Sequence, residues 1–265
     1  MTKLIAEIGW NHMGDIDLAK KMIVEAKKNG ADFVKTQVFD IKYLKNGPWD
    51  NDGRREIYEK ATLTDEKYKE IKKFAEDNQI HFFTSTFNRE TAERIAKIDN
   101  KIFKVPSVEA RNKELMDFVC DSFDEVIIST GTLLEKEIID LSNKYKKFKI
   151  SLLHCVSTYP CAFENTNLPK INFLKSLTPN VGFSDHTQGI EASVLSLNYG
   201  LNYIEKHFTV DNDLPGRDNK FAILPHQLKH LKDYVEIFKR VKIEHGNNFQ
   251  ECEKEVREVY AGRWG

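Results

Sequence analysis

The sequence lacks several features that would place it in a specialised class of protein. Its four cysteines include no Cys-x-x-Cys pair, which argues against a structural zinc site and against a disulfide framework. Neither sign of charge is in excess, because 40 Lys and Arg residues face 41 Asp and Glu residues, for a formal net charge of -1. Neither nucleic acid nor an anionic membrane is therefore an expected partner.

Long apolar segments are also missing. No uncharged stretch reaches the ~18 residues that a membrane-spanning helix needs. The N-terminal sequence MTKLIAEIGW lacks the basic, apolar and small residues that follow one another in a secretory signal. We therefore expect a cytoplasmic protein with free thiols. Its 265 residues, 40% of them hydrophobic, are enough for one large domain.

Short apolar or β-branched runs predict eight strands, which alternate with amphipathic helical segments. The predicted strands cover residues 4–8, 33–36, 81–86, 102–105, 126–129, 150–154, 181–184 and 203–207. Regular alternation requires a parallel sheet, because each crossover returns the chain to the same edge. Eight units fit a single (β/α)8 TIM barrel. A doubly wound open sheet is the competing fold, but the glycine-rich phosphate turn typical of it does not follow the first strand.

The longest gap between predicted strands follows the second one. Residues 46–53 within it are rich in turn-forming residues, and they predict a long loop that lies over the barrel mouth. We expect residues 1–245 to form the barrel. Residues 246–265 are expected to form a C-terminal helix and tail.

Polar residues end or follow nearly every predicted strand, where a TIM barrel carries its active site. They are Glu7, Asn11, His12, Lys35, Gln37, Ser85, Thr86, Lys104, Ser107, Glu109, Ser129, Thr130, His154, Ser157, Tyr159, Ser184, Asp185, His186, Lys206 and His207. A single polar group at a strand end is ordinarily just solvated. Their recurrence along the chain predicts a polar site at the barrel mouth.

Two histidines end neighbouring predicted strands, His186 in Gly-Phe-Ser-Asp-His and His207 in Tyr-Ile-Glu-Lys-His. Adjacent strands lie ~5 Å apart, so both imidazoles can bind one ion. Two histidine ligands leave coordination positions for water and substrate oxygens, which suits a metal that polarises a carbonyl group. A pair of hydrogen-bonded core histidines is the alternative.

Two lysines, Lys35 and Lys104, lie in strands that are otherwise apolar. An inward-pointing ammonium group costs several kcal/mol unless an anion accompanies it. A phosphate or carboxylate of a substrate is one such anion, and neighbouring hydroxyl groups would help to bind it. The alternatives are an internal ion pair with Glu7 or Glu109, and a Schiff base. Glu7 and Glu109 are themselves candidates for proton transfer at the mouth.

The ordered motifs resemble those of the sialic acid synthase family, whose barrels condense phosphoenolpyruvate with an N-acylated amino sugar. The resemblance covers about residues 1–245. The motifs are Ala6-Glu7-Ile8-Gly9 with Asn11-His12 and Gly14, Lys35-Thr36-Gln37, Ser85-Thr86-Phe87, Lys104 with Ser107 and Glu109, Ser129-Thr130-Gly131, Leu153-His154-Cys155 with Tyr159-Pro160, Gly182 to Thr187, Glu205 to Thr209, and Pro215-Gly216-Arg217-Asp218.

The resemblance implies a TIM-barrel synthase that forms a 3-deoxy-2-keto sugar acid and phosphate. It implies that His186 and His207 hold a divalent cation, Mn²⁺ or Mg²⁺. The implied phosphoenolpyruvate contacts are Lys35, Thr86, Lys104, Ser107, Ser157 and Ser184. The implied sugar contacts are Gln37, Glu109, Tyr159 and Asp218.

On this basis we expect catalytic roles for three residues. Glu109 would handle the proton at the aldehyde or at the attacking water, and Glu7 would order water on the metal. The charge of Lys104 would stabilise the phosphate. Two other functions remain open from the sequence: a barrel aldolase or lyase that uses a lysine Schiff base, and a non-catalytic sugar-binding barrel.

The chain also departs from the pattern that it resembles. Members of the family usually continue into an antifreeze-like domain, which completes the sugar site of the partner subunit in a swapped dimer. We expect no such domain here, and we expect a homodimer. Ser157 stands where the family commonly has Asn, and Arg217 stands where it has Pro beside Asp218. The sugar pocket is therefore expected to differ more than the phosphate site.

Overall fold

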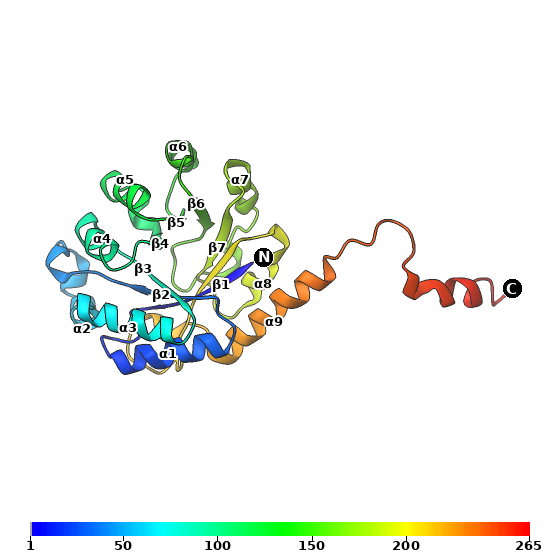
Figure 1. Ribbon diagram of the computed structural model, residues 1–265, viewed down its shortest axis with the longest axis horizontal. Helices are drawn as coiled ribbons and strands as arrows, with labels where there is room; N and C mark the ends of the chain where they lie inside the picture. The colour runs from blue at the N-terminus through cyan, green and yellow to red at the C-terminus, as the bar shows by residue number, and fades with distance from the viewer. Residues whose placement is uncertain (1) are drawn as a thin grey trace.

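The computed structural model describes residues 2–265 and shows, within them, eight parallel strands that form a closed barrel (Figure 1). The strands are β1 Lys3–Gly9, β2 Phe33–Gln37, β3 His81–Ser85, β4 Ile102–Val105, β5 Glu125–Ser129, β6 Ile150–His154, β7 Val181–Asp185 and β8 Tyr203–His207. They follow one another around the barrel in chain order, and β8 pairs with β1. The predicted TIM barrel is confirmed, with strand ends that differ by no more than one residue.

Helices surround the barrel on the outside (Figure 1). They are α1 Ile16–Lys28, α2 Arg54–Ala61, α3 Asp65–Asp77, α4 Arg89–Ala96, α5 Lys113–Ser122, α6 Glu135–Tyr145, α7 Lys170–Leu177, α8 Glu191–Ser196 and α9 Pro225–Val241. Helix α1 illustrates why these segments are helical. The Asp15 carboxylate accepts the Leu18 N–H and caps α1, and apolar residues at helical spacing, from Ala19 to Ala26, are buried against the sheet.

The apolar core has two parts, because successive strand residues point to opposite faces of the sheet. The larger part lies between the sheet and the helices. The smaller part fills the inside of the barrel and consists of Ile5, Phe33, Phe83, Ile127, Leu153 and Tyr203. Two residues further along several strands, the inward positions are polar. The interior therefore has an apolar floor beneath a polar layer.

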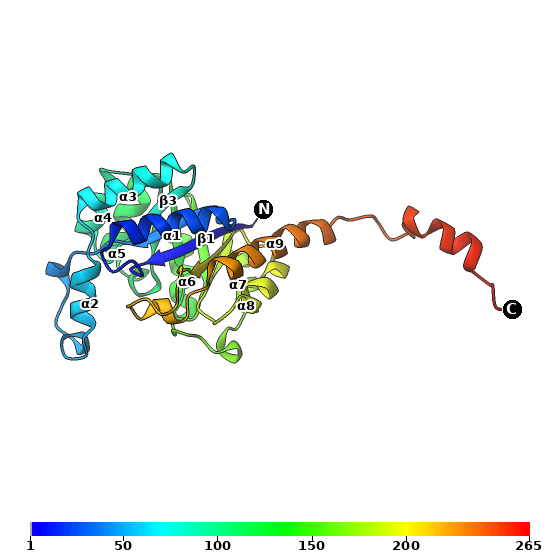
Figure 2. The same cartoon turned by 90° about the horizontal axis from the view of Figure 1, so that it is seen from below.

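The predicted long loop after the second strand is present, and it contains structure that the sequence analysis did not predict. The short 3-10 turns Ile41–Tyr43 and Pro48–Asp50 precede α2. The Tyr58 ring of α2 stacks on Trp10, with ring centroids 4.9 Å apart. Figure 2 shows this excursion at the end of the barrel toward which β1 runs.

The C-terminal segment leaves the barrel after α9. It extends away from the end opposite to the excursion and carries a short helical piece, with a 3-10 turn at Glu251–Glu253 and a π-helical turn at Val256–Tyr260 (Figure 2). Its residues from 240 onward are exposed. Among residues 2–265, every helix is too short or too polar to cross a bilayer. The division at residue 245 stays a prediction.

Candidate active site

A cluster of buried charges occupies the inside of the barrel above the apolar floor. Lys35 Nζ lies 2.8 Å from Glu7 Oε2 and 3.7 Å from Glu205 Oε2, and Lys104 Nζ lies 3.6 Å from Glu205 Oε1. All four side chains are almost fully buried. Both lysines thus point inward. Lys35 therefore forms an internal ion pair with Glu7, one of the alternatives that the sequence left open. Glu205 lies between the ammonium groups of Lys35 and Lys104.

The electrostatics of the cluster follow from this arrangement. Burial opposes the charge of Glu205, but the two lysines outweigh burial and lower the pKa of that carboxyl to about 2. Burial also opposes the charge of Lys35, and the charges of Glu205 and Glu7 raise its pKa nevertheless. Burial raises the pKa of Glu7 and lowers the pKa of Lys104. Glu205 is therefore the fixed anion, while Glu7 and Lys104 are the groups whose protonation is most easily changed.

Beside Lys104 lies a set of small polar groups from the ends of β4, β5 and β6. Lys104 Nζ donates to Ser129 Oγ at 2.7 Å, and the Gly131 N–H donates to Ser107 Oγ at 3.0 Å. A Cβ atom at Gly131 would lie 2.5 Å from Ser157 Oγ and 2.8 Å from Ser107 Oγ. Because Gly131 has no side chain, both hydroxyl groups lie close to its backbone N–H. Such a group of donors suits an anion.

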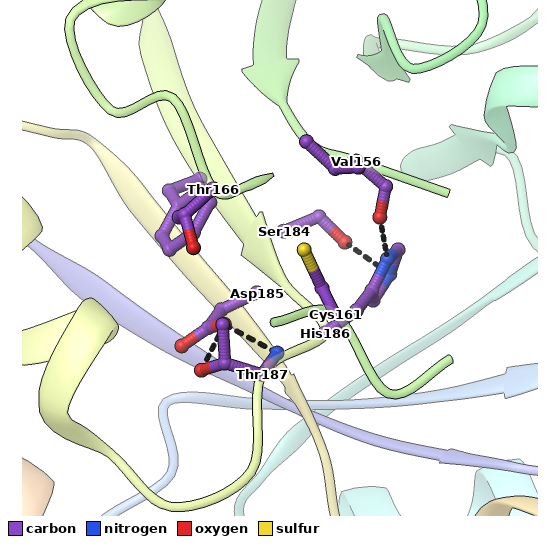
Figure 3. Close-up of a pocket in the computed structure, with 8 residues that line it drawn as sticks. Val156, Cys161, Thr166, Ser184, Asp185, His186 and Thr187 are labelled. Atoms are coloured by element: carbon purple, nitrogen blue, oxygen red, sulfur yellow. Dashed lines mark hydrogen bonds between the residues drawn. The ribbon is translucent and has the colours of Figure 1, made fainter. Parts of the chain in front are cut away.

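The two predicted metal ligands lie on the same rim. The ring centroids of His186 and His207 are 5.7 Å apart. His186 Nδ1 hydrogen-bonds the Val156 carbonyl at 2.8 Å, and its Nε2 lies 3.4 Å from Ser184 Oγ (Figure 3). Register pairing places His207 beside Glu7, which in turn pairs with Lys35. The histidine pair and the lysine cluster are therefore parts of one site.

The histidines fit a divalent cation by their chemistry. Burial lowers the pKa of His186 and of His207 to about 4, so both imidazoles are neutral at pH 7, as ligation requires. His207 Nδ1 is buried without a hydrogen-bond partner among residues 2–265, and Asp218 Oδ2 lies 3.7 Å from it. No group of three or more His, Cys, Asp or Glu in that range is placed to hold a metal. The protein would thus contribute two ligands and leave other positions open.

Tyr159 and Asp218 lie next to the two histidines at the mouth of the barrel. The half-exposed Tyr159 ring lies 4.2 Å from the His186 ring, centroid to centroid. Asp218 Oδ2 accepts the Trp10 Nε1–H at 2.6 Å. Trp10, stacked on Tyr58, therefore fixes the Asp218 carboxylate and joins the excursion to the histidine side of the site.

Three predicted site residues have other contacts. Gln37 Nε2 donates to Glu7 Oε1 at 2.8 Å, so Gln37 adjoins the cluster. The Thr86 hydroxyl donates to the Asn88 carbonyl at 3.2 Å, in the turn before α4. Glu109 is half-buried, accepts from Asn112 Nδ2, and makes no ion pair with Lys35 or Lys104 within residues 2–265. The ion-pair alternative thus applies to Glu7 and not to Glu109.

No role was predicted from the sequence for Glu205, Ser129 or Trp10, although each lies in the site. For Glu205 a signal existed, since side chains alternate along a strand and His207 was expected to point inward. Ser129 ends its strand and gave a similar signal. The bond between Trp10 and Asp218 joins residues 208 positions apart, and no local pattern encodes it.

Buried neutral histidines predict acid sensitivity of the fold. Burial lowers the pKa of His12 to about 4 from 6.5, and the Gly14 N–H donates to its Nδ1. The unfolded chain binds this proton first as pH falls, so the free energy of unfolding decreases between pH 6.5 and 4, by up to about 3 kcal/mol for this residue. Urea unfolding of the wild type and of His12→Asn at pH 7 and pH 4.5 tests this. Equal pH dependence in the two proteins contradicts it.

The closed barrel and the polar layer at its C-terminal mouth define a TIM-barrel protein with a small-molecule site of lysines, hydroxyl groups and neutral histidines. The NeuB family model matches residues 22–247. The chain belongs to the NeuB family, and the predicted resemblance to the sialic acid synthases is confirmed.

Relatives with assigned names agree with this membership. N,N'-diacetyllegionaminic acid synthase of Campylobacter jejuni is 35% identical over 247 residues, which are 87% of this chain and 74% of that protein. Pseudaminic acid synthase of the same species is 33% identical, over 88% of this chain and 72% of that protein. The crystal structure of an N-acetylneuraminic acid synthetase from Leptospira borgpetersenii superposes with a TM-score of 0.88 at 30% identity, covering 100% and 93% of the two chains.

Proposed function

We propose that this chain condenses phosphoenolpyruvate with an open-chain N-acylated amino sugar and releases phosphate. The product is a 3-deoxy-2-keto sugar acid. The observation that carries the proposal is the meeting of Lys35, Lys104 and a hydroxyl cradle with two neutral histidines on one rim. The names of the relatives, which are synthases of such acids, support it.

The phosphate group of phosphoenolpyruvate would bind between Lys104 and the cradle of Ser107, Ser157 and the Gly131 N–H. Ammonium and N–H donors neutralise and orient a phosphate through charge-assisted hydrogen bonds. Lys35 and Ser184 would lie toward its other end, and Thr86 would complete the set once its hydroxyl turns from the Asn88 carbonyl. Glu205 keeps Lys35 charged and opposes part of the effect of burial on the pKa of Lys104.

His186 and His207 would hold Mn²⁺ or Mg²⁺, with Asp218 and Glu7 close by. The cation supplies Lewis-acid polarisation of a carbonyl oxygen. Gln37, Tyr159 and Asp218 would face the sugar, and Trp10 fixes the orientation of the Asp218 carboxylate. Metal dependence, the choice of metal and the identity of the sugar are parts of the proposal.

In the reaction, the methylene carbon of phosphoenolpyruvate bonds to the aldehyde carbon of the sugar. The enol carbon becomes positively charged and water adds to it, after which the carbon–oxygen bond to phosphate breaks and leaves a ketone. Holding both reactants at one rim supplies up to ~7 to 11 kcal/mol of the barrier. Glu109 would transfer the proton at the aldehyde or the water, and Glu7 would order water at the histidines.

The proposal is tested by incubating the protein with phosphoenolpyruvate, Mn²⁺ and a panel of aldoses. Mass spectrometry should detect a product whose mass is the sum of an aldose and pyruvate. Omission of the aldose should leave phosphoenolpyruvate intact. A panel that includes N-acetylmannosamine and its deoxy-diamino relatives, yet yields no such product, would contradict the proposal and favour a non-catalytic sugar-binding barrel.

One observation favours a second candidate, a Schiff-base aldolase or lyase. Burial lowers the pKa of Lys104, and a neutral amine is the form that attacks a carbonyl group. Borohydride would then trap a substrate on Lys104, and a chelator would leave the activity unchanged. The main proposal requires the opposite result for both treatments.

Glu109→Gln should lower the rate of phosphate release by about 10² to 10⁴-fold, the usual range for a lost general acid or base. Binding of phosphoenolpyruvate should change little, because Glu109 makes no ion pair with Lys35 or Lys104 in the described chain. Turnover and calorimetric binding measure the two effects. Unchanged turnover would remove Glu109 from the mechanism. Glu137→Gln, a change in the first turn of α6 and beyond the end of β5, serves as the control.

We also propose a homodimer in the cytoplasm. Light scattering of the purified protein gives the number of subunits directly. A monomer at micromolar concentration would contradict the dimer.

A further inference from the structure

An ion pair lies behind the histidines, on the outer face of the barrel wall. Asp185 ends β7 and Lys206 lies in β8, and the two residues are register partners. Their charged groups are 2.9 Å apart, with side-chain exposures of 0% for Asp185 and 3% for Lys206. Since side chains alternate along a strand, this pair faces outward where Ser184, Glu205 and His207 face inward.

The pair binds Thr187, the residue after His186, and Asp185 itself is the residue before His186. Asp185 Oδ1 accepts the Thr187 N–H and the Thr187 hydroxyl, each at 2.8 Å, as Figure 3 shows. Lys206 Nζ donates to the Thr187 carbonyl, and Ser193 of α8 donates to Asp185 Oδ2. His186 therefore lies between two residues that are both fixed to Lys206, and Lys206 is the chain neighbour of His207.

The stability of the barrel does not account for such a pair. Removing two charges from water costs several kcal/mol per ion, and apolar replacements of buried pairs are often neutral or stabilising. The preceding outward positions, Phe183 in β7 and Ile204 in β8, are apolar and belong to the outer core. The backbone pairing of β7 with β8 ends at Asp185 and Lys206. What the pair adds is a side-chain link at this last position that also reaches Thr187, beyond His186.

We infer that Asp185 and Lys206 are positioning residues, which hold His186 and His207 at the separation that a shared divalent cation needs. The inference rests on the proposed function for the identity of the bound ion. It adds to that function two residues that touch neither substrate nor metal and act through the backbone of their neighbours.

The test is the double variant Asp185→Asn with Lys206→Met in the full chain. Asn keeps an acceptor for Thr187, Met keeps the length of the lysine stem, and no charge remains unpaired. We expect the variant to fold with an unfolding free energy close to that of the wild type. The Kd for Mn²⁺ alone, measured by calorimetry, should rise about 10- to 100-fold.

A crystal structure of the metal-free variant gives a second readout that does not depend on the metal. The His186 and His207 ring centroids, 5.7 Å apart in the wild type, should shift by more than about 0.5 Å. Unchanged separation together with unchanged Mn²⁺ affinity would overturn the inference. If the wild type does not bind Mn²⁺, the metal site of the proposed function fails, and the separation alone decides the inference.

Glu125→Gln is the matched control. Glu125 is also a buried carboxylate in a strand, paired with Lys149 at 2.6 Å and with the Tyr203 hydroxyl at 2.6 Å. It lies at the start of β5, at the opposite end of the barrel from the histidines. Its loss should leave both the Mn²⁺ affinity and the histidine separation unchanged.

Discussion

Replacing His207 with Asn is expected to abolish metal-dependent turnover in a protein that remains folded. His207 has a buried Nδ1 without a hydrogen-bond partner among residues 2–265, and burial holds its pKa near 4, so it would be a neutral ligand at pH 7. Loss of a Lewis acid removes several kcal/mol of transition-state stabilisation. Each ~1.4 kcal/mol is a factor of ten, so phosphate release should fall at least about a thousandfold.

His154→Asn is the control for this experiment. His154 is a buried histidine at the end of β6, but it hydrogen-bonds the Thr166 carbonyl and stacks on Phe183 outside the barrel. Its replacement should lower thermal stability and leave Mn²⁺ binding intact. Calorimetry with Mn²⁺ and a phosphate-release assay should therefore separate the two variants. If His207→Asn keeps its Mn²⁺ affinity and its turnover, the histidine pair is a structural feature only.

Replacing Glu205 with Gln is expected to produce the largest loss of stability. The change keeps the shape of the side chain but leaves Lys104 without its carboxylate and Lys35 with Glu7 alone. Removing one partner of a buried ion pair costs about 3 to 5 kcal/mol of unfolding free energy. The pKa of Glu205 is about 2, so the wild type keeps this contribution throughout neutral and mildly acidic pH and loses it as pH falls from 4.5 toward 2.

Phosphate distinguishes a purely structural cluster from an anion-binding site. If the lysines bind the phosphate of a substrate, inorganic phosphate should raise the melting temperature of Glu205→Gln more than that of the wild type. A bound anion replaces the missing carboxylate, and ligands that bind the folded state stabilise it. Glu125→Gln, whose partner Lys149 is mostly exposed, should lose less stability and gain no more from phosphate than the wild type does. Equal phosphate effects in all three proteins would contradict anion binding by the cluster.

The barrel was predictable because its signal is periodic. Eight apolar runs separated by amphipathic segments permit few folds, and the inward direction of Lys35 and Lys104 follows from their apolar neighbours. The excursion was predictable as a loop but not as the carrier of α2, since residues 54–61 have a weakly apolar face whose contact, Tyr58 on Trp10, is supplied by the tertiary structure.

The site was predictable where strand register alone determines it. His186 and His207 are brought together by the pairing of β7 with β8, as expected. Strand register does not determine the orientation of a single hydroxyl group beyond the end of a strand. The Thr86 hydroxyl was predicted to face the substrate, but it donates to the Asn88 carbonyl. The internal anion of the cluster, Glu205, lies in β8, whereas Lys35 lies in β2, far away along the chain. The two residues can be recognised as partners only once the barrel is closed.

The most direct test of the account is to follow [3-¹³C]phosphoenolpyruvate by ¹³C NMR with the aldose that the screen identifies and Mn²⁺. In the proposed condensation, the labelled methylene carbon should appear bonded to the former aldehyde carbon, with one phosphate released for each bond formed and no reaction after chelation. Recovery of the label as pyruvate, or bond formation that persists without divalent metal, would contradict it.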